Sequence, residues 1–500
     1  MVPDILKKNK NHVITFFTIL IFYIYRVYEN IFPKNYQQDD VSELRVVFID
    51  NFFCALESGD NHPLFTMFIW LTSRLIDRPE YIISFVLVFL TILSMVILFN
   101  IMKDQFTLEI ALFFLVVLLF SPSIINYSLT LKQYSFELFA TVYSLRFLQQ
   151  NLNSEASLQN NKKFYMISCT LVLFSFVCVI PILLTLFFIF VDSKKLNFKL
   201  IIASMIALAP FSGYFIRKVE RVSLGGYWDD FFITTELSSI EDFYNNFYFL
   251  NSLFLKSLFV ENLVPIIFVV YLFSIISTFF SKENILLCSL AGVSVVILLS
   301  VLRLYPLGGG RTDILFLPYL LILISGLANS IYLKIRNRNT RYILFIFIFL
   351  YSFNGVSTTK VFYKNENMES IIFNFEDKFN SNDSTIIVTA DQYPSLLYYS
   401  QDLVNSVTYQ IDDCKKIKPN IENLITYKNS QYFGNLFEKP SIDPNIIFEK
   451  EHIILIGIEL PGTTGKYRAV NDFILENNFA LTSKTEYENG LISLEFNSDE

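Results

Sequence analysis

Two adjacent carboxylates, Asp39 and Asp40, stand in a polar segment shortly after the first long apolar stretch of the chain. A pair of carboxylates can bind a divalent metal, and one of them can act as general base on an acceptor hydroxyl. Most acidic pairs are solvated surface, but Glu57, Asp60 and His62 follow in the same segment, and His62 opens the next apolar stretch. We therefore take Asp39 and Asp40 as candidate catalytic residues, with Glu57 and Asp60 as an additional acidic loop.

Cationic candidates stand further along the chain. Arg311 follows three glycines in YPLGGGRTD, just before an apolar stretch. Glycines allow close backbone approach, and an arginine there can hold a phosphate with two hydrogen bonds. Arg303 and Tyr305 share that loop, so we expect more than one phosphate contact; the alternative is an interfacial turn whose arginine extends toward lipid headgroups. Lys132 interrupts a largely apolar segment, where a charge is costly and usually functional unless it lies near an interface.

The elements that carry these residues belong to a mostly apolar chain. Its 500 residues are 53% hydrophobic and 17% charged, with a mean hydropathy of +0.45, whereas a soluble domain has about 25% charged residues. Residues 360–500 hold 12 Lys+Arg against 22 Asp+Glu, which leaves 27 against 24 for the first 359. We predict a polytopic α-helical membrane domain over 1–359 and a small acidic soluble domain over 360–500.

Composition also excludes some partners and compartments. A pI near 5.3 and the lack of a basic, aromatic-rich patch argue against nucleic acid. The cysteines form no CxxC pair, and Cys169, Cys178 and Cys288 stand in apolar runs, where cysteine is usually a small hydrophobe. Only Cys54 and Cys414 can face an oxidising compartment, and the sequence does not favour a disulfide between them.

The apolar stretches predict about eleven membrane-spanning helices. They lie near 12–28, 63–77, 81–102, 107–120, 126–148, 164–191, 198–216, 263–280, 284–302, 313–333 and 342–356. Basic clusters mark the cytoplasmic side, and three of them follow this pattern if the first helix exits the cytoplasm. These clusters are Lys7–Lys10, Lys194–Lys199 and Lys334–Arg341. The domain 360–500 is then extracytoplasmic.

The region 63–163 leaves two topologies open. Four crossing segments would put the loop 149–163 outside, although it contains Lys162 and Lys163. If one segment does not cross, 164–191 becomes a tight hairpin broken near Pro181, with lysine pairs at both cytoplasmic ends.

Two long polar segments fall on the outer side, 29–62 and 217–262. In the first, Leu44–Leu56 has the pattern of an amphipathic helix on the membrane surface. The tail alternates helices and strands, which suggests a small α/β domain. We expect helices near 364–380 and 466–478 and strands at DSTIIVTAD, HIILIGIEL and 481–495, without a Gly-rich phosphate loop after a strand.

Three motifs in order resemble a known family. Asp39-Asp40 followed by DNHPLFTMFIWLTSRLI resembles the start of the membrane-embedded GT-C glycosyltransferases, in the branch of protein O-mannosyltransferases and the aminoarabinose transferase of lipid A. FSPSIINYSLTLKQYSFEL is similar to that family's S-P-x-x-x-x-Y-S-x-E-x-R-x-Y element. LYPLGGGRTDILFLPYL looks like the late loop of its bacterial members. The resemblance covers roughly residues 12–356.

The chain departs from the family pattern in two places. The family's double proline appears here as His62-Pro63-Leu64, and Lys132 or Gln133 replaces the arginine of the second element. The resemblance implies Asp39 or Asp40 as the base, with a slight preference for Asp40. It also implies that His62 and Arg311 neighbour the donor phosphate; with them we group Arg303, Tyr305 and Lys132.

The resemblance implies an inverting glycosyltransferase in the bacterial inner membrane. It would transfer a sugar from a polyprenyl-phosphate donor in the membrane lipid to a hydroxyl of an acceptor glycan, lipid or protein at the outer face. It requires no cofactor, although paired carboxylates can hold a divalent metal. The alternatives are a transporter or flippase, a polysaccharide polymerase or ligase that handles lipid-linked sugars, and a structural scaffold. A transporter predicts paired half-helices and charges deep in the spans, whereas the charges here concentrate in outer loops.

Overall fold

A computed structural model gives the structure of the chain. The residues described below are 21, 24, 45–48, 51–58, 62–76, 78–119, 121–128, 130–153, 158–193, 232–233, 240–256, 258–259, 264–280, 283–308, 312–335, 371, 373–375, 384–389, 409–412, 416–419, 424–427, 451–458, 471, 474–476, 478–486 and 491–498.

The chain divides into two compact units, each described by itself. The first, helical unit comprises Met1–Glu29 and Ile82–Val361, and the second comprises Asn30–Tyr81 and Phe362–Glu500.

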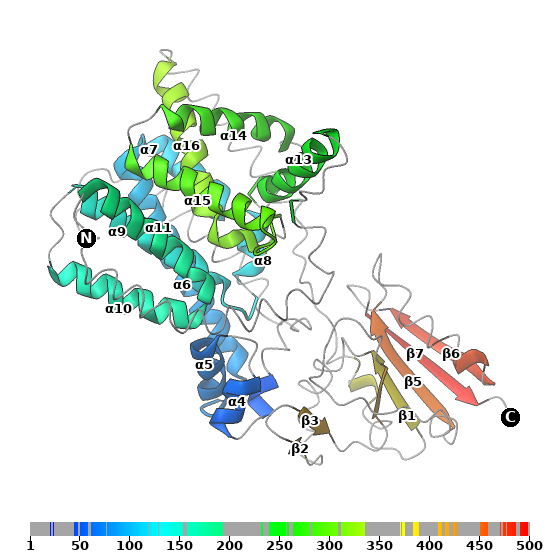
Figure 1. The fold of residues 1–500 in the computed structure, drawn as a ribbon. Coiled ribbons are helices and arrows are strands. Elements are labelled where there is room, and N and C mark those ends of the chain that lie inside the picture. The colour runs from blue at the N-terminus through cyan, green and yellow to red at the C-terminus, as the bar shows by residue number, and fades with distance from the viewer. Residues whose placement is uncertain are drawn as a thin grey trace. The chain divides into compact units, whose positions relative to one another are not determined.

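Most helices coincide with apolar stretches of the sequence (Figure 1). Two places differ: Ile240–Lys256 is a helix within the polar segment 217–262, and the stretch near 126–148 is divided between the helices Pro122–Tyr127 and Tyr134–Asn153. The helices are α6 (Pro79–Gln105), α7 (Leu108–Leu119), α8 (Pro122–Tyr127), α9 (Tyr134–Asn153), α10 (Leu158–Phe174), η2 (Phe176–Cys178), α11 (Val179–Ser193), α13 (Ile240–Lys256), α14 (Val264–Phe279), α15 (Asn284–Val301), η5 (Thr312–Leu315) and α16 (Leu317–Lys334). The stretches near 198–216 and 342–356 lie outside the described residues, and the one near 12–28 is described only at the helical residues Ile21 and Ile24.

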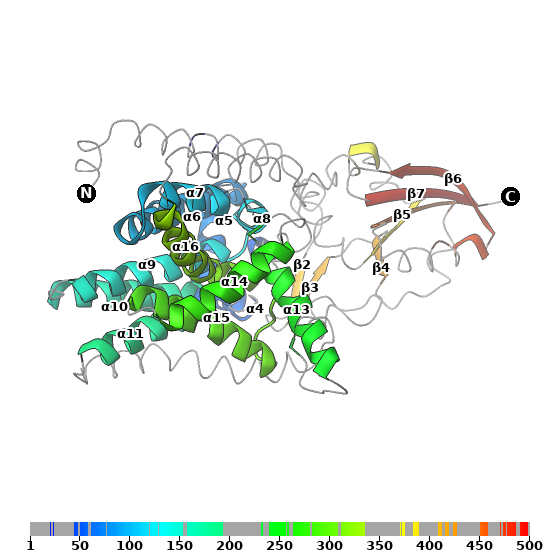
Figure 2. The same ribbon diagram turned by 90° about the horizontal axis from the view of Figure 1, so that it is seen from above.

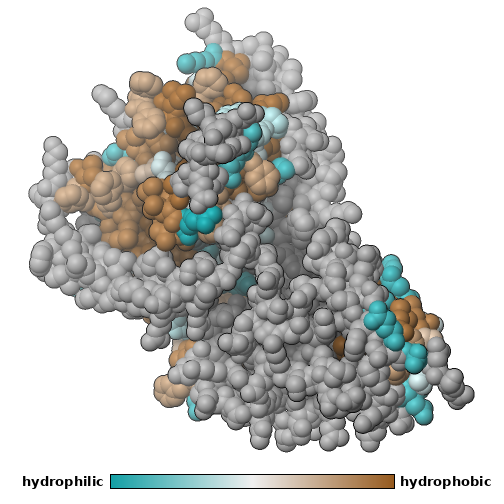
Figure 3. Space-filling view, turned by 45° about the vertical axis from the view of Figure 1, so that its right-hand side comes forward, coloured by the Kyte–Doolittle hydropathy of each residue, from teal (hydrophilic) through white to brown (hydrophobic). Residues whose placement is uncertain are grey.

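Within the described part of the chain, 3 helices are long and apolar enough to cross a membrane: Pro79–Gln105, Asn284–Val301 and Leu317–Lys334. Shorter apolar helices accompany them at Pro63–Ser73, Leu108–Leu119, Phe176–Val191 and Val264–Phe279. The outer face of α14 is apolar, with Ile266, Val269, Phe273 and Ile276 exposed. In Figure 3 apolar residues gather over much of the described surface of the helical unit. Such a surface suits lipid rather than water, and the protein is a membrane protein.

Helix α9 is the axis of one helix cluster (Figures 1 and 2). Phe147 stacks on Phe164 with ring centroids 3.8 Å apart, and Phe136 stacks on Phe174 at 4.1 Å, so α10 runs antiparallel to α9. Helix α11 begins beside the same Phe136, because the Cys178 Sγ just before it lies 3.9 Å from the Phe136 carbonyl oxygen. The end of α10 and the start of α11 therefore meet at this end of α9, and the two helices form a hairpin.

The hairpin considered from the sequence over 164–191 is present, with one correction, while the number of segments of 63–163 that cross the membrane stays a prediction. The break falls at Ser175–Cys178, where η2 separates the two helices, and not near Pro181. Pro181 occupies the first turn of α11, where its missing N–H removes no intrahelical hydrogen bond. The helix is interrupted at Ser175, whose backbone is extended, with φ −155° and ψ 121°.

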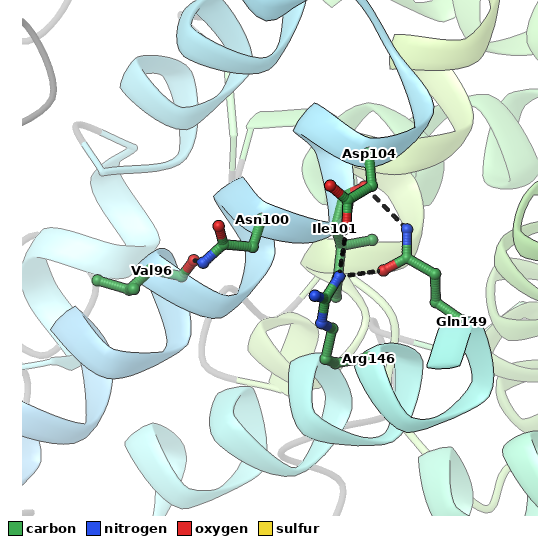
Figure 4. Close-up of polar contacts among 6 residues, drawn as sticks. All are labelled: Val96, Asn100, Ile101, Asp104, Arg146 and Gln149. Carbon is green, nitrogen blue, oxygen red and sulfur yellow. Dashed lines mark hydrogen bonds and ion pairs between the residues drawn. The ribbon is translucent and has the colours of Figure 1, made fainter. Parts of the chain in front are cut away.

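Polar contacts fix how α6 and α9 run relative to each other. The hydroxyls of Thr91 and Ser135 lie 3.0 Å apart near the start of α9. At its other end Arg146 Nη1 lies 2.7 Å from Asp104 Oδ2 and 2.6 Å from Gln149 Oε1 (Figure 4). Gln149 Nε2 also donates to the Ile101 carbonyl at 3.2 Å. The two helices therefore run in the same direction, and α7 is the return segment between them.

Helix α16 is the buried centre of the second cluster, with α14 and α15 packed on it. A Cβ added at Gly292 would meet the Tyr319 ring at 2.5 Å, and one at Gly326 would meet Leu286 at 2.7 Å. Small residues therefore let α15 and α16 approach closely, as is common between membrane helices. The Thr107 backbone N–H donates to Asn329 Oδ1 at 2.9 Å, which ties α7 to the C-terminal half of α16.

In the second unit, Leu44–Leu56 is not one amphipathic helix. A 3₁₀ turn, η1 (Arg45–Phe48), precedes α4 (Phe52–Ser58). Asn51 separates them because its Oδ1 accepts the Phe53 N–H at 2.9 Å, a helix-start contact that sequence periodicity does not show. α5 (Pro63–Ser73) packs on α4 through Phe52 and Trp70, with ring centroids 5.2 Å apart.

The cysteines differ from expectation at one position. Cys54 on α4 is disulfide-bonded, which the sequence did not favour, whereas Cys169, Cys178 and Cys288 are free thiols as expected. Cys414 lies outside the described residues. Spatial proximity, and not spacing in the sequence, decides whether such a bond can form.

The tail contains a mixed five-stranded sheet of order β4-β1-β5-β7-β6. Its strands are β1 (Ser384–Thr389), β4 (Leu424–Tyr427), β5 (His452–Ile458), β6 (Phe479–Glu486) and β7 (Leu491–Ser498), and β2 (Tyr409–Asp412) pairs with β3 (Lys416–Pro419) separately. β1 is parallel to β4 and β5, and β7 is antiparallel to β5 and β6. The predicted strands at β1, β5, β6 and β7 are confirmed, and β2, β3 and β4 were not predicted. The helix predicted near 364–380 is helical at 371 and 373–375, and the one predicted near 466–478 is helical at 471 and 474–476.

Candidate active site

The predicted site residues are distributed over both units. Asp39, Asp40, Asp60 and Arg311 lie outside the described residues, and Glu57 is described only as part of the α4 backbone. His62 belongs to the second unit, while Lys132, Arg303 and Tyr305 belong to the helical unit.

His62 is the N-cap residue of α5. Its backbone is extended, with φ −124° and ψ 94°, and Pro63 occupies the first helical position, where its fixed φ suits a helix start. The His62 carbonyl accepts the Thr66 N–H at 2.9 Å. The partly buried imidazole is thus carried by the positive end of a helix, a place that favours anions.

Lys132 lies in the turn that leads into α9. Its backbone N–H donates to the Thr130 carbonyl at 2.7 Å, and the Gln133 carbonyl accepts the N–H groups of Phe136 and Glu137. Lys132 is half-buried and stands just before the helix starts. Lys132 therefore stands at the beginning of a helix, and the choice between a functional role and a position near a membrane interface stays open.

A buried carboxylate, Glu137, lies one turn further along α9 and was not selected from the sequence. Glu137 is 2% exposed, and its Oε1 accepts a hydrogen bond from Ser175 Oγ at 2.6 Å. Ser175 is fully buried at the break between α10 and η2. The Thr141 hydroxyl then donates to the Leu315 carbonyl at 2.7 Å, which joins α9 to η5. Glu137 therefore stands where the hairpin break, α9 and η5 meet.

The loop between α15 and α16 carries the other candidate residues. Arg303 is exposed and has a positive φ of 56°. The Tyr305 hydroxyl donates to the Thr312 carbonyl at 2.8 Å, and the Gly308 N–H donates to Asp313 Oδ1 at 3.0 Å. Asp313 is fully buried and, like Glu137, was not selected from the sequence.

Tyr305 and the two buried carboxylates share one environment. Burial of the Tyr305 hydroxyl, and then the charges of Glu137 and Asp313, raise its pKa well above the ordinary value for tyrosine. The hydroxyl therefore stays protonated, and its one proton is engaged by the Thr312 carbonyl. Through this hydrogen bond Tyr305 stabilises the loop between α15 and α16. Phosphate binding by Tyr305 stays a prediction.

The helical unit thus gathers several charged groups at one end. Glu137 and Asp313 are buried there, and Lys132 and Arg303 belong to the segments immediately beside them. The described residues include no group of three or more His, Cys, Asp or Glu side chains that could hold a metal ion.

No family model matches the chain, and no curated protein is similar to it in sequence. Solved structures are similar in fold. ArnT from Cupriavidus metallidurans matches with a TM-score of 0.52 and 9% identity in the apo state, over 97% of both chains. The same protein bound to undecaprenyl phosphate matches with a TM-score of 0.52 and 10% identity, again over 97% of both chains.

An oligosaccharyltransferase from Archaeoglobus fulgidus in the apo form matches with a TM-score of 0.50 and 10% identity. That match covers 79% of this chain and 64% of the archaeal one. These likenesses give the chain the GT-C-type glycosyltransferase fold. The family resemblance stated from the sequence motifs is confirmed at the level of the fold.

The sequence carries a signal for two of the three residues that were missed, Glu137 and Asp313, and none for Ser175. Glu137 is an acidic residue in the mostly apolar first half of α9, and a charge in such a segment by itself marks a functional or structural role. Asp313 follows the glycine-arginine segment by two residues. Ser175 gives no signal, because a serine in an apolar run normally bonds to its own helix.

Proposed function

We propose that the protein is an inverting glycosyltransferase that moves a sugar from a polyprenyl-phosphate donor to a hydroxyl acceptor at the outer face of the bacterial inner membrane. The observation that carries this proposal is the GT-C-type fold, matched over 97% of both chains by a protein solved with undecaprenyl phosphate. The acceptor is a glycan, a lipid or a protein.

The chemistry follows from the candidate residues. Asp39 or Asp40 takes the proton of the acceptor hydroxyl, whose oxygen attacks the anomeric carbon of the donor sugar. The bond between that carbon and the phosphate oxygen breaks, its electron pair stays on the phosphate, and the configuration at the carbon inverts. His62, Lys132, Arg303, Tyr305 and Arg311 are the groups proposed to hold the phosphate as charge builds on it. No cofactor is needed for this step.

Charge distribution supports the proposed orientation. Lys103 at the end of α6, Lys162 and Lys163 early in α10, and Lys334 at the end of α16 all lie toward the Arg146 end of the helices. Basic residues near helix ends favour the cytoplasmic side. This supports the proposal that the opposite end, with Glu137 and Asp313, faces the outer side.

The second unit supports the same orientation. Disulfides persist in oxidising compartments, and the bonded Cys54 therefore favours an outer location for the second unit. We propose that the C-terminal sheet is an extracytoplasmic domain, in line with the acidic composition of residues 360–500.

A transporter or flippase of lipid-linked sugars is the second candidate function. The observation in its favour is the pair of buried acidic side chains, Glu137 and Asp313, since buried charges in membrane helices often mark transport pathways.

Proteoliposomes containing the purified protein separate the two functions. A radiolabelled polyprenyl-phosphate sugar is supplied with acceptor on one side only, and both labelled acceptor and donor movement across the bilayer are measured. A transferase labels the acceptor and releases unlabelled polyprenyl phosphate. Donor that crosses the bilayer without sugar transfer would overturn the proposal in favour of a flippase.

A further inference from the structure

The loop between α15 and α16 is closed by two hydrogen bonds that overlap along the chain. One runs from the Tyr305 hydroxyl to the Thr312 carbonyl at 2.8 Å, and the other from the Gly308 N–H to Asp313 Oδ1 at 3.0 Å. The glycine run that begins at Gly308 is therefore bracketed by contacts on both sides.

The loop is also anchored to its surroundings. A Cβ added at Gly308, whose φ is +80°, would meet Leu253 Cβ at 2.6 Å and the Leu250 carbonyl oxygen at 3.0 Å on α13. On the other side, the Tyr305 ring packs edge-to-face on Phe316 with centroids 5.7 Å apart. The base of the loop is thus held between α13 and the start of α16.

Asp313 is central to this closure. Its side chain is fully buried, and a buried carboxylate requires hydrogen-bond donors to offset its lost hydration. The backbone N–H of Gly308 supplies one of them, and hydrogen bonds to charged groups are stronger than those to neutral ones. The carboxylate therefore determines where the backbone of the loop turns.

We propose that Asp313 is a positioning residue for donor binding: it fixes Gly308, and thereby sets the loop between α15 and α16, at whose start Arg303 stands, against the donor phosphate. This inference deepens the proposed function and rests on it. Asp313 does not touch the donor; it acts through the backbone of the loop.

Three substitutions at this position separate the hydrogen bond from the charge. Asp313→Asn keeps an acceptor oxygen at the same place and loses the charge, Asp313→Glu keeps the charge and moves the oxygen, and Asp313→Ala removes both. The measured quantities are the KM for the polyprenyl-phosphate sugar, the kcat at saturating donor, and the Kd for undecaprenyl phosphate as a binding probe.

We expect Asp313→Ala and Asp313→Glu to raise the donor KM and the Kd about tenfold, the effect of losing one hydrogen bond to a charged group, with kcat nearly unchanged. Asp313→Asn stays within about threefold of wild type, because it still accepts from Gly308. Asp104→Asn, which alters a carboxylate at the opposite end of the helical unit, is the matched control and leaves both constants unchanged. If Asp313→Ala does not fold, the comparison of donor KM and Kd between Asp313→Asn and Asp313→Glu still tests the inference.

Two outcomes would overturn the inference. In the first, all Asp313 variants bind undecaprenyl phosphate as wild type does. In the second, Asp313→Asn is impaired while Asp313→Glu is not, so that charge and not loop position is what matters. Failure of the proposed function looks different, because then wild-type protein itself neither binds undecaprenyl phosphate nor transfers sugar.

Discussion

Polar side chains connect both ends of α9 to neighbouring segments, but the two ends differ in the kind of hydrogen-bond partner and in its exposure. At one end Arg146 pairs directly with Asp104 and Gln149, and these side chains remain partly exposed, at 19% for Arg146 and 42% for Asp104. At the other end Glu137 accepts from a serine hydroxyl and Asp313 from a backbone N–H, and both carboxylates are at most 2% exposed.

We interpret this difference as one between a contact that only aligns two helices and a contact that serves donor binding. A partly exposed ion pair contributes little and can be replaced at small cost, so the Arg146 contact serves to align α6 with α9. Buried carboxylates are expensive to maintain, and chains retain them where position or charge is needed. The end that carries Glu137 and Asp313 is accordingly the end to which we assign donor binding.

The largest expected effect concerns the side of the membrane on which the second unit lies. Three of the other four cysteines are free thiols, so we expect Cys54 to be joined to Cys414. Two thiols lose two protons and two electrons to form the bond, and a disulfide-bearing oxidant of the outer compartment is reduced to two thiols. Peptide mapping without reductant should give a Cys54–Cys414 peptide, and reduction should lower the stability of this unit by about 2–4 kcal/mol. Free Cys54 in protein isolated from membranes with thiols blocked would contradict the outer location.

The next largest effect tests the buried end of α9. Glu137→Ala removes the acceptor of the Ser175 hydroxyl and should lower stability by about 1–3 kcal/mol, with a loss of sugar transfer of about tenfold or more. Glu137→Gln keeps an acceptor oxygen and should restore most of the stability. Thermal unfolding in detergent and donor transfer are measured on the same preparations. If Glu137→Ala transfers sugar as wild type does, Glu137 has only a packing role.

Ser175→Ala gives a smaller effect at the same contact. It leaves the Glu137 carboxylate buried without its hydroxyl donor, so we expect a loss of about 1–2 kcal/mol. The double variant Ser175→Ala with Glu137→Gln should lose less than the sum of the single changes, because the two groups form one contact. Additive losses would mean that the 2.6 Å contact does not couple them.

The smallest effect is expected at the opposite end. Arg146→Gln removes a partly exposed ion pair and should cost at most about 1 kcal/mol, with the donor KM unchanged. The same thermal unfolding and transfer assays apply. A large rise in donor KM here would remove the contrast between the two ends of α9.

Local apolar periodicity was sufficient to predict most helices. The bounds of α6, α7, α14 and α15 follow the apolar stretches because about 20 apolar residues in lipid leave few other structures. The hairpin break at Ser175 was misplaced, since it depends on a side-chain contact to Glu137 on another helix. The Cys54 disulfide was missed for the same reason.

The site was predictable only where residue type alone gave the signal. Lys132, Arg303 and Tyr305 stood out as polar groups beside apolar stretches, and the structure places them at or near one end of the helical unit. Asp313 did not, because the role that we propose for it depends on its hydrogen bond with the Gly308 backbone five residues earlier, which sequence spacing does not reveal. The roles of Asp39, Asp40 and Arg311 stay predictions.

The most direct test of the central claim is sugar transfer from a polyprenyl-phosphate donor by wild-type protein and by Asp39→Asn, Asp40→Asn and the double variant. Loss of a general base costs roughly 100-fold or more, so at least one single variant and the double variant should fall by that amount. Glu486→Gln, at an exposed ion pair with Lys484, is the control and should transfer as wild type does. Equal transfer by wild type and the double variant would contradict the account.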